Sequence, residues 1–198
     1  MTHNPIKLYL AGLVIGLIGA GIIIGTVQLS KPSSDNSFTL DKTKFASWQT
    51  VTTKTGLVSA RFPTAPTQQN ITVPINDSDY SMNQETYTSQ DGDGVTYFLS
   101  IASYPEPFDI EKSNLILQTS LEGMLKAVTG NQLVESSYET YKNTPSVEFL
   151  IQNDTLYYRG KLFLKDNTLY QAFVSYTDAA LHNDAYVYFL DSITTKLP

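Results

Sequence analysis

The chain has 198 residues, with 13 lysines and arginines against 19 aspartates and glutamates, and it contains no cysteine. The lack of cysteine excludes disulfide bonds, thiol catalysis, iron–sulfur clusters and zinc–thiolate sites. After residue 29 the chain has 12 basic and 19 acidic residues, a net charge of −7, which argues against binding to nucleic acid and against docking on anionic lipid head groups.

The first predicted element is a membrane-spanning helix over Leu8–Leu29, which follows a short flank of residues 1–7. This run has no charged side chain, and a helix rising about 1.5 Å per residue covers the roughly 30 Å hydrocarbon core over that length. A cleavable signal peptide is the alternative, but its apolar region is usually about 7–15 residues and ends at a small-x-small site, which Gly25–Ser30 matches poorly. We therefore expect an uncleaved anchor, with the short basic tail inside and the following domain extracytoplasmic.

Small residues recur within this predicted span. Gly12, Gly16 and Gly19 lie on similar sides of a helix, and small residues about four apart let two membrane helices approach closely. The pattern is consistent with a homodimer or a partner helix in the membrane. The alternative is that glycine is simply common in membrane helices.

Residues 30–44 are polar, and their Lys-Pro-Ser-Ser-Asp-Asn-Ser run is typical of a flexible linker. Residues 45–198 then form one predicted domain, because a segment of this length builds one hydrophobic core but hardly two. Alternation of apolar and polar residues predicts its strands. These are Val58–Phe62, Ile71–Ile75, Tyr80–Ser89, Val95–Tyr104, Gln132–Tyr141, Ser146–Gln152, Leu156–Leu164 and Thr168–Tyr176.

Turn residues and helical spacing complete the predicted order. An Asp-Gly pair between the third and fourth strands indicates a hairpin. A helix begins near Asp109 or Ser113 and ends before Gly130, a typical C-terminal cap. A closing helix begins at Asn183 or Asp184. Grouped strands, a helix, more strands and a last helix predict an α+β fold with an antiparallel sheet covered by helices.

The segment Val58-Ser-Ala-Arg-Phe-Pro-Thr-Ala-Pro66 resembles the strand opening of PsbP-like domains, which ends in a Phe-Pro-x-x-Pro pattern. The order of the later elements is similar as well, so the resemblance covers about residues 45–196. It implies an αβα sandwich around an antiparallel sheet. It also implies a binding or assembly module and no enzyme, and no functional residue of the family carries over to a position in this chain.

Histidine chemistry has few candidates. Only His3 and His182 are present, and His3 precedes the predicted span. A Ser-His-Asp triad would therefore need His182 with Asp178 or Asp184 and an unidentified serine. The alternative is an exposed or capping histidine at the start of the closing helix, and we expect this role.

Two pairs of aspartates have an Asp-x-Asp spacing, Asp77 with Asp79 and Asp91 with Asp93. Neither is followed by the remaining ligands of an EF-hand loop, and turn geometry explains the second pair. We predict no metal site. Acidic side chains scattered over strands leave a carboxylate-dependent hydrolase open, but no spacing selects two of them.

Thirteen tyrosines are a further feature of the composition. They are candidates for an aromatic binding face, because tyrosine combines a large contact area with a polar group. They alternate along predicted strands, so we expect at least half of them to point into the core. The candidates are Tyr97, Tyr104, Tyr138, Tyr141, Tyr157, Tyr158, Tyr170, Tyr176, Tyr186 and Tyr188.

The expected function is therefore non-enzymatic, with no catalytic, cofactor-binding or metal residue and no cofactor. We predict a single-pass protein anchored by residues 8–29, whose extracytoplasmic domain binds or assembles a protein partner of the cell envelope. Two alternatives stay open: a hydrolase that uses only carboxylates and tyrosines, and a small-ligand sensor that signals through the membrane helix.

Overall fold

A computed structural model of the chain describes residues 40–75, 80–177 and 183–195. The predicted membrane span, with Gly12, Gly16 and Gly19, lies outside these described residues, as does the linker up to residue 39. Within the described ranges, no helix is both long enough and apolar enough to cross a bilayer.

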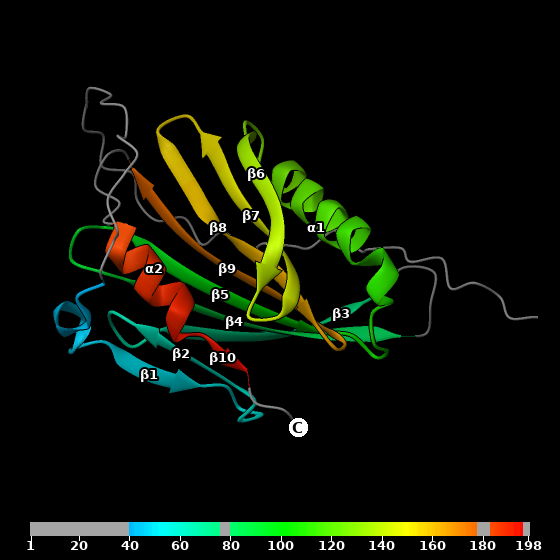
Figure 1. Cartoon of the computed structure of the whole chain (residues 1–198), viewed down its shortest axis with the longest axis horizontal. Coiled ribbons are helices and arrows are strands. Elements are labelled where there is room, and N and C mark those ends of the chain that lie inside the picture. The colour runs from blue at the N-terminus through cyan, green and yellow to red at the C-terminus, as the bar shows by residue number, and fades with distance from the viewer. Residues whose placement is uncertain (1–39, 76–79, 178–182, 196–198) are drawn as a thin grey trace, which may run out of the picture.

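The centre of the domain is an antiparallel sheet of seven strands in the order β3-β4-β5-β9-β8-β7-β6 (Figure 1). Each neighbouring pair is antiparallel, and all but the contact of β5 with β9 join strands that are consecutive in sequence. The strands are β3 (Thr67–Pro74), β4 (Ser81–Gln90), β5 (Thr96–Ser103), β6 (Gln132–Tyr141), β7 (Thr144–Asn153), β8 (Leu156–Lys165) and β9 (Thr168–Thr177).

A second, smaller sheet lies beside the first. It has the order β1-β2-β10, with β1 (Gln49–Thr52) and β10 (Thr194–Thr195) on either side of β2 (Val58–Phe62). In β2, Val58, Ala60 and Phe62 are buried and Arg61 is exposed, as the alternation in sequence predicts. A short 3-10 helix, η1 (Lys42–Phe45), precedes β1, so regular structure begins within the residues predicted as linker.

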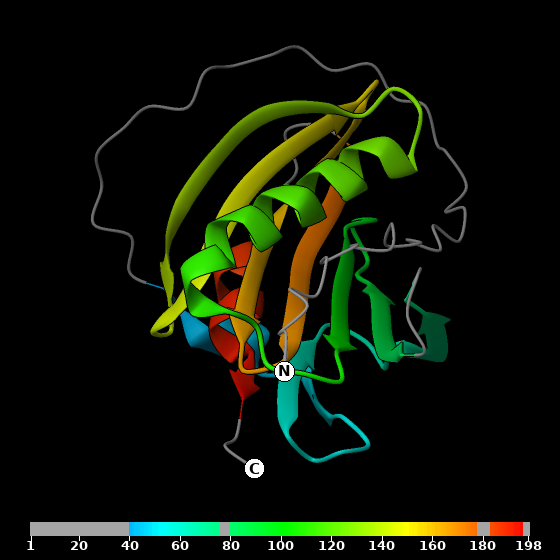
Figure 2. The same ribbon diagram turned by 90° about the vertical axis from the view of Figure 1, so that its right-hand side faces the viewer.

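Helix α1 (Ser113–Ala127) covers one face of the large sheet (Figure 2). It follows a 3-10 turn, η2 (Ile110–Lys112), in which the Glu111 N–H donates a hydrogen bond to the Asp109 carboxylate. The apolar stripe of α1 packs against the inward residues of β7, β8 and β9. Its buried apolar members are Ile116, Leu117, Leu121 and Met124.

The opposite face is covered by the small sheet and by α2 (Asn183–Ser192), so the two helices lie on opposite sides of the large sheet (Figures 1 and 2). Phe189 of α2 is fully buried and packs edge-on against Tyr97 of β5, with ring centroids 5.5 Å apart. Phe45 of η1 stacks on Tyr188 at 4.4 Å. These aromatic contacts join α2 to β5 and η1 to α2.

The α+β class with an antiparallel sheet and two helices is confirmed. The expectation of one sheet was wrong, because Val58–Phe62 pairs only with β1 and β10 and not with the central strands. Strand β3 begins at Thr67, earlier than the predicted Ile71, since its pairing with β4 extends along residues that have no apolar alternation.

Candidate protein interface at an open sheet edge

Strand β6 forms one rim of the large sheet, beside α1 (Figure 1). Nine of its ten residues are exposed, and no described strand pairs with its outer edge. An unpaired edge presents a row of backbone N–H and C=O groups that a further strand can bind. This strand is therefore the candidate site.

The turn after β6 fixes which backbone groups point outward. Lys142 and Asn143 both have positive φ, at 49° and 64°, as a two-residue type I′ hairpin requires. The residues that flank such a turn, Tyr141 and Thr144, form a hydrogen-bonded pair, and pairs then alternate along the hairpin. The next pair, Pro145 with Thr140, is non-bonded. Proline fits there because this position donates no backbone N–H to β6.

The alternation continues along the regular part of β6. The register pairs Tyr138 with Val147 and Ser136 with Phe149, and both pairs fall in the non-bonded class. The backbone groups of Ser136, Tyr138 and Thr140 therefore point away from β7, toward the open edge. The register shift between Leu133 and Glu135 ends this regular stretch.

Apolar side chains are concentrated on the same strand. Of the eight exposed large hydrophobic residues in the described ranges, three lie on β6. They are Leu133 at 41% exposure, Val134 at 54% and Tyr138 at 45%. The opposite rim, β3, carries one, Ile71, and ends at Pro74, a residue that limits further pairing at an edge. The β6 edge is therefore the better candidate for a contact.

A charged cluster holds β6 to the body of the sheet on the α2 side. Lys161 of β8, whose side chain is only 11% exposed, donates hydrogen bonds to Glu139 of β6 and to Glu148 of β7. The distance to Glu148 is 2.6 Å. Arg159 bonds the other carboxylate oxygen of Glu148 at 3.2 Å and lies over the ring of Tyr186, 4.6 Å from its centroid.

The electrostatics of this cluster favour a structural role for Glu148. Partial burial acts to raise the pKa of Glu148, but the hydrogen bond and charge of Lys161, with Arg159, outweigh burial and lower it below the usual 4.5. The Tyr186 hydroxyl also donates to Glu148, and burial with this carboxylate raises the pKa of Tyr186. A general acid in a glycosidase needs a raised carboxyl pKa, which is the opposite of the shift at Glu148.

The β6–β7 turn is also fixed to α2. Lys142 Nζ donates to the carbonyl oxygens of Leu190, Asp191 and Ile193, and the Tyr141 hydroxyl donates to Leu190. These carbonyls lie at the C-terminal end of α2, where a cation also interacts favourably with the helix dipole. The turn end of β6, from Glu139 to Lys142, is therefore held, while the outer edge of the strand stays open.

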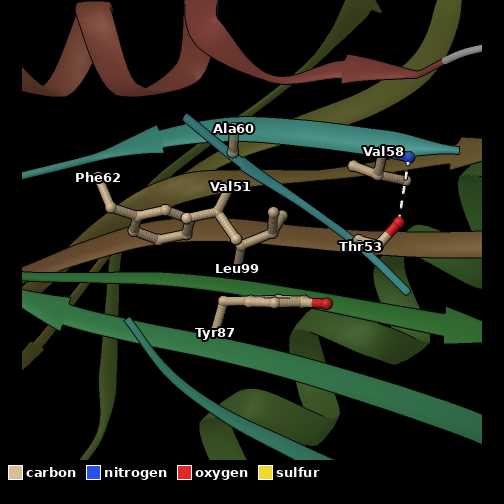
Figure 3. A pocket seen from close by; sticks show the side chains of 7 residues that line it. All are labelled: Val51, Thr53, Val58, Ala60, Phe62, Tyr87 and Leu99. Atoms are coloured by element: carbon tan, nitrogen blue, oxygen red, sulfur yellow. Dashed lines mark hydrogen bonds between the residues drawn. The ribbon is translucent and has the colours of Figure 1, made fainter. Parts of the chain in front are cut away.

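A narrow crevice separates the two sheets (Figure 3). It leaves no room for the centre of a water molecule, whereas pockets for drug-sized ligands usually measure about 300–1,000 Å³. Its wall has no carboxylate, and its one hydrogen bond in the figure joins the Val58 N–H to the Thr53 hydroxyl. The lining residues are Val51, Thr53, Val58, Ala60, Phe62, Tyr87 and Leu99.

The carboxylates considered for metal binding or catalysis do not converge in the described part of the chain. Both oxygens of Asp91 accept hydrogen bonds within the β4–β5 turn, from Asp93 N, Val95 N and the Tyr97 hydroxyl. Asp184 pairs with Lys44 at 3.1 Å. No group of three potential metal ligands occurs within the described ranges. His3, Asp77, Asp79, Asp178 and His182 lie outside those ranges.

Most of the candidate tyrosines serve packing. Tyr97, Tyr158, Tyr170, Tyr186 and Tyr188 are buried, and the remaining candidates other than Tyr138 are partly buried. Tyr138 is the one exposed candidate, and it lies on β6. The charged cluster was not predicted, although two basic residues spaced by two in an otherwise apolar strand, Arg159 and Lys161, indicate a polar site on one sheet face.

Comparison with known proteins bears on the fold. No family model and no curated protein matches the sequence. The solution structure of cyanobacterial PsbP (CyanoP) from Synechocystis sp. PCC 6803 is similar with a TM-score of 0.52 at 8% identity, covering 83% of this chain and 98% of that one. The extracellular domain of PknH from Mycobacterium tuberculosis matches with a TM-score of 0.32 at 9% identity, over 65% and 81% of the two chains, which is too low to support an argument. The chain thus has the α+β fold of PsbP-like proteins.

Proposed function

We propose that this chain is a single-pass membrane protein whose extracytoplasmic PsbP-like domain binds or assembles a protein partner of the cell envelope without catalysing a reaction. The observation that carries the proposal is the open β6 edge. It combines outward backbone groups with the exposed Tyr138 on a strand that is held at its turn and by Lys161. Such an edge is preorganised for strand addition, because little further ordering is needed on binding.

The arrangement of charges supports binding over catalysis. Glu148 is held by Lys161, Arg159 and Tyr186, so both of its carboxylate oxygens already accept hydrogen bonds. The crevice between the sheets is small and has no acidic group in its wall. Neither the hydrolase nor the ligand-sensor alternative is favoured by an observation on the described residues.

The membrane part of the proposal rests on sequence. The charge-free run Leu8–Leu29 has the length of a membrane span, and the face of Gly12, Gly16 and Gly19 is suited to a homodimer or a partner helix. We expect the full-length protein to stay in the membrane fraction after extraction with alkaline carbonate. A variant that lacks residues 8–29 should be released, and release of the full-length protein would refute the anchor.

The partner is tested by photo-crosslinking in cells. A photoreactive amino acid replaces Tyr138 on β6 or, as the matched control, Gln69 on the opposite rim, which is also exposed. Mass spectrometry should identify the same envelope protein repeatedly from position 138 and not from position 69. Capture of nothing, or the same products from both rims, would refute the proposal that β6 binds a partner.

A further inference from the structure

We propose that the β6 edge binds an extended segment of a different polypeptide, in which basic side chains alternate with apolar ones. This inference rests on the proposed function and specifies the chemistry of the partner. Its basis is the combination of outward backbone groups, exposed carboxylates on one face of β6 and an exposed aromatic ring on the other.

The backbone sets the register of the incoming segment. Ser136, Tyr138 and Thr140 direct their N–H and C=O groups outward, so an added strand forms its ladder with these three residues. Its side chains then alternate between the two faces of the sheet. One set lies beside Glu135, Ser137 and Glu139, and the other lies beside the side chains of the outward residues.

The first set meets negative charge. On this face β6 and β7 contribute Glu135, Glu139 and Glu148, and the nearby cations are Arg159 and Lys161 of β8 and Lys142 of the β6–β7 turn, whose Nζ is bound to carbonyl oxygens at the end of α2. Arg159 and Lys161 approach the carboxylates from β8, which lies on the far side of β7 from the open edge. Glu135 is exposed and forms no ion pair in the described ranges, and Glu139 keeps 40% of its side chain exposed. A lysine or arginine on the incoming segment can pair with these two exposed carboxylates, because opposite charges on adjacent strands stabilise a pairing.

The second set meets Tyr138. Its side chain is on the α1 face, since its register partner Val147 is in the core beneath α1. Burial raises the pKa of Tyr138, and the nearby Glu122 of α1 adds to this effect, so the phenol stays neutral. Ser136 and Thr140 flank it with short side chains. An apolar residue of the partner beside Tyr138 therefore gains contact area without burying a charge.

Charge also disfavours a second copy of this chain at the edge. Two copies of β6 related by a two-fold axis would pair as antiparallel strands. The registers that let their outward backbone groups bond to each other have the axis at Ser137, Tyr138 or Glu139. The first sets Glu135 of one copy opposite Glu139 of the other, and the last sets the two copies of Glu139 against each other. The register centred on Tyr138 leaves the Glu139 carboxylates diagonal neighbours. Like charges directly opposite each other destabilise strand pairing, so charge disfavours the first and last of these registers.

The test uses full-length protein in zwitterionic nanodiscs, which do not attract basic peptides. The probe is a fluorescent octapeptide that alternates lysine and valine, and binding is followed by anisotropy. Two peptides serve as controls: one of the same composition in blocks, and one with glutamate in place of lysine. We expect the alternating basic peptide to bind about tenfold more tightly than either control. Equal binding of the alternating and block peptides, or of the glutamate peptide, would overturn the inference.

Two variants locate the binding to β6. Ser136→Pro removes an outward N–H and leaves the β6–β7 ladder intact, so it should abolish binding. Glu135→Lys should weaken binding about tenfold, whereas Asp93→Lys, with the same charge change on the exposed β4–β5 turn, should not. An equal effect of the two lysine variants would refute the site. If Ser136→Pro does not fold, the two lysine variants still decide the question.

The outcomes distinguish this inference from the proposed function. Crosslinking from position 138 without binding of the alternating peptide would retain a partner at β6 and overturn its proposed chemistry. Peptide binding without any crosslinked envelope protein would support the chemistry and remove the envelope partner. A concentration-dependent dimer that Ser136→Pro abolishes would overturn the inference in favour of a second copy.

Discussion

Gly160 in β8 leads to the most specific stability prediction. It pairs with Phe149 on one side and Phe173 on the other, and the two rings lie 6.4 Å apart on the α1 face. A Cβ atom at Gly160 would lie 2.3 Å from the Ala172 carbonyl oxygen and from Phe173 Cβ. Ordinary contact begins near 3.4 Å, so β8 and β9 would have to separate by about 1 Å in the centre of the sheet.

The expected cost of Gly160→Ala follows from this overlap. Overpacking of a core usually costs about 1–3 kcal/mol, and here the clash includes backbone atoms that cannot rotate away. We therefore expect a loss of about 3 kcal/mol or more in the free energy of unfolding. With a urea dependence of about 1–3 kcal/mol per molar, the unfolding midpoint should fall by about 1–3 M.

Trp48 provides the assay, because it is the only tryptophan and packs against Tyr97 and Tyr188, away from the substitution. Its fluorescence and far-UV circular dichroism should give the same midpoint in urea. Gly123→Ala is the matched control: it lies in α1 with no atom within 4 Å of the added Cβ, and it should stabilise by about 0.5–1 kcal/mol. An unchanged midpoint for Gly160→Ala would refute the strand packing described.

Three further variants give four predictions in the same urea assay. Lys161→Met removes the cation between two carboxylates and should lower the free energy of unfolding by about 1–2 kcal/mol at neutral pH. This cost is less than for a fully buried ion pair, because the carboxylates are partly exposed. An unchanged midpoint would show that the ion pairs of Lys161 contribute nothing to stability. The pKa of Glu148 is lowered in the folded protein, so its contribution to stability is present above the usual pKa of 4.5 and is lost as the pH falls through the folded pKa. The difference in midpoint between wild type and Lys161→Met should therefore shrink in acid. A difference that stays constant with pH would contradict this. Asn153→Ala removes the bond to the Thr129 carbonyl after α1 and should cost about 1 kcal/mol. The side-chain amide of the buried Gln171 has no hydrogen-bond partner in the described ranges, so Gln171→Met should raise the free energy of unfolding by about 1 kcal/mol. A loss of stability would show that this amide forms hydrogen bonds in the folded protein.

Local patterns were sufficient for most of the large sheet. The strands from Gln132 to Thr177 are separated by two-residue turns such as Asp166-Asn167, so their extent was predictable to within two residues. The helix over Ser113–Ala127 was also predictable, since its apolar residues recur at helical spacing.

Features that depend on distant pairing were not predictable. Strand β1 has no buried residue, and β10 has only two residues, so neither has a periodic pattern. Both are strands only because β2 lies between them. The candidate edge was missed for a related reason. Its strand was predicted, but whether Gln132–Tyr141 lies at the rim or in the centre depends on the strand order and not on its own residues.

The pairing of β10 with β2 has a consequence for the order of folding during synthesis. Thr194 pairs with Ser59, and Thr168–Thr177 pairs with β5 from the first half of the domain. The hairpins between neighbouring strands can form early, but the small sheet cannot be completed until residue 195 has been synthesised. Such long sequence separations slow folding. The apolar face of β2 packs with α2 as well as with the large sheet, so a chain released before α2 would expose Val58, Ala60 and Phe62, and this segment is where such incomplete chains are expected to aggregate.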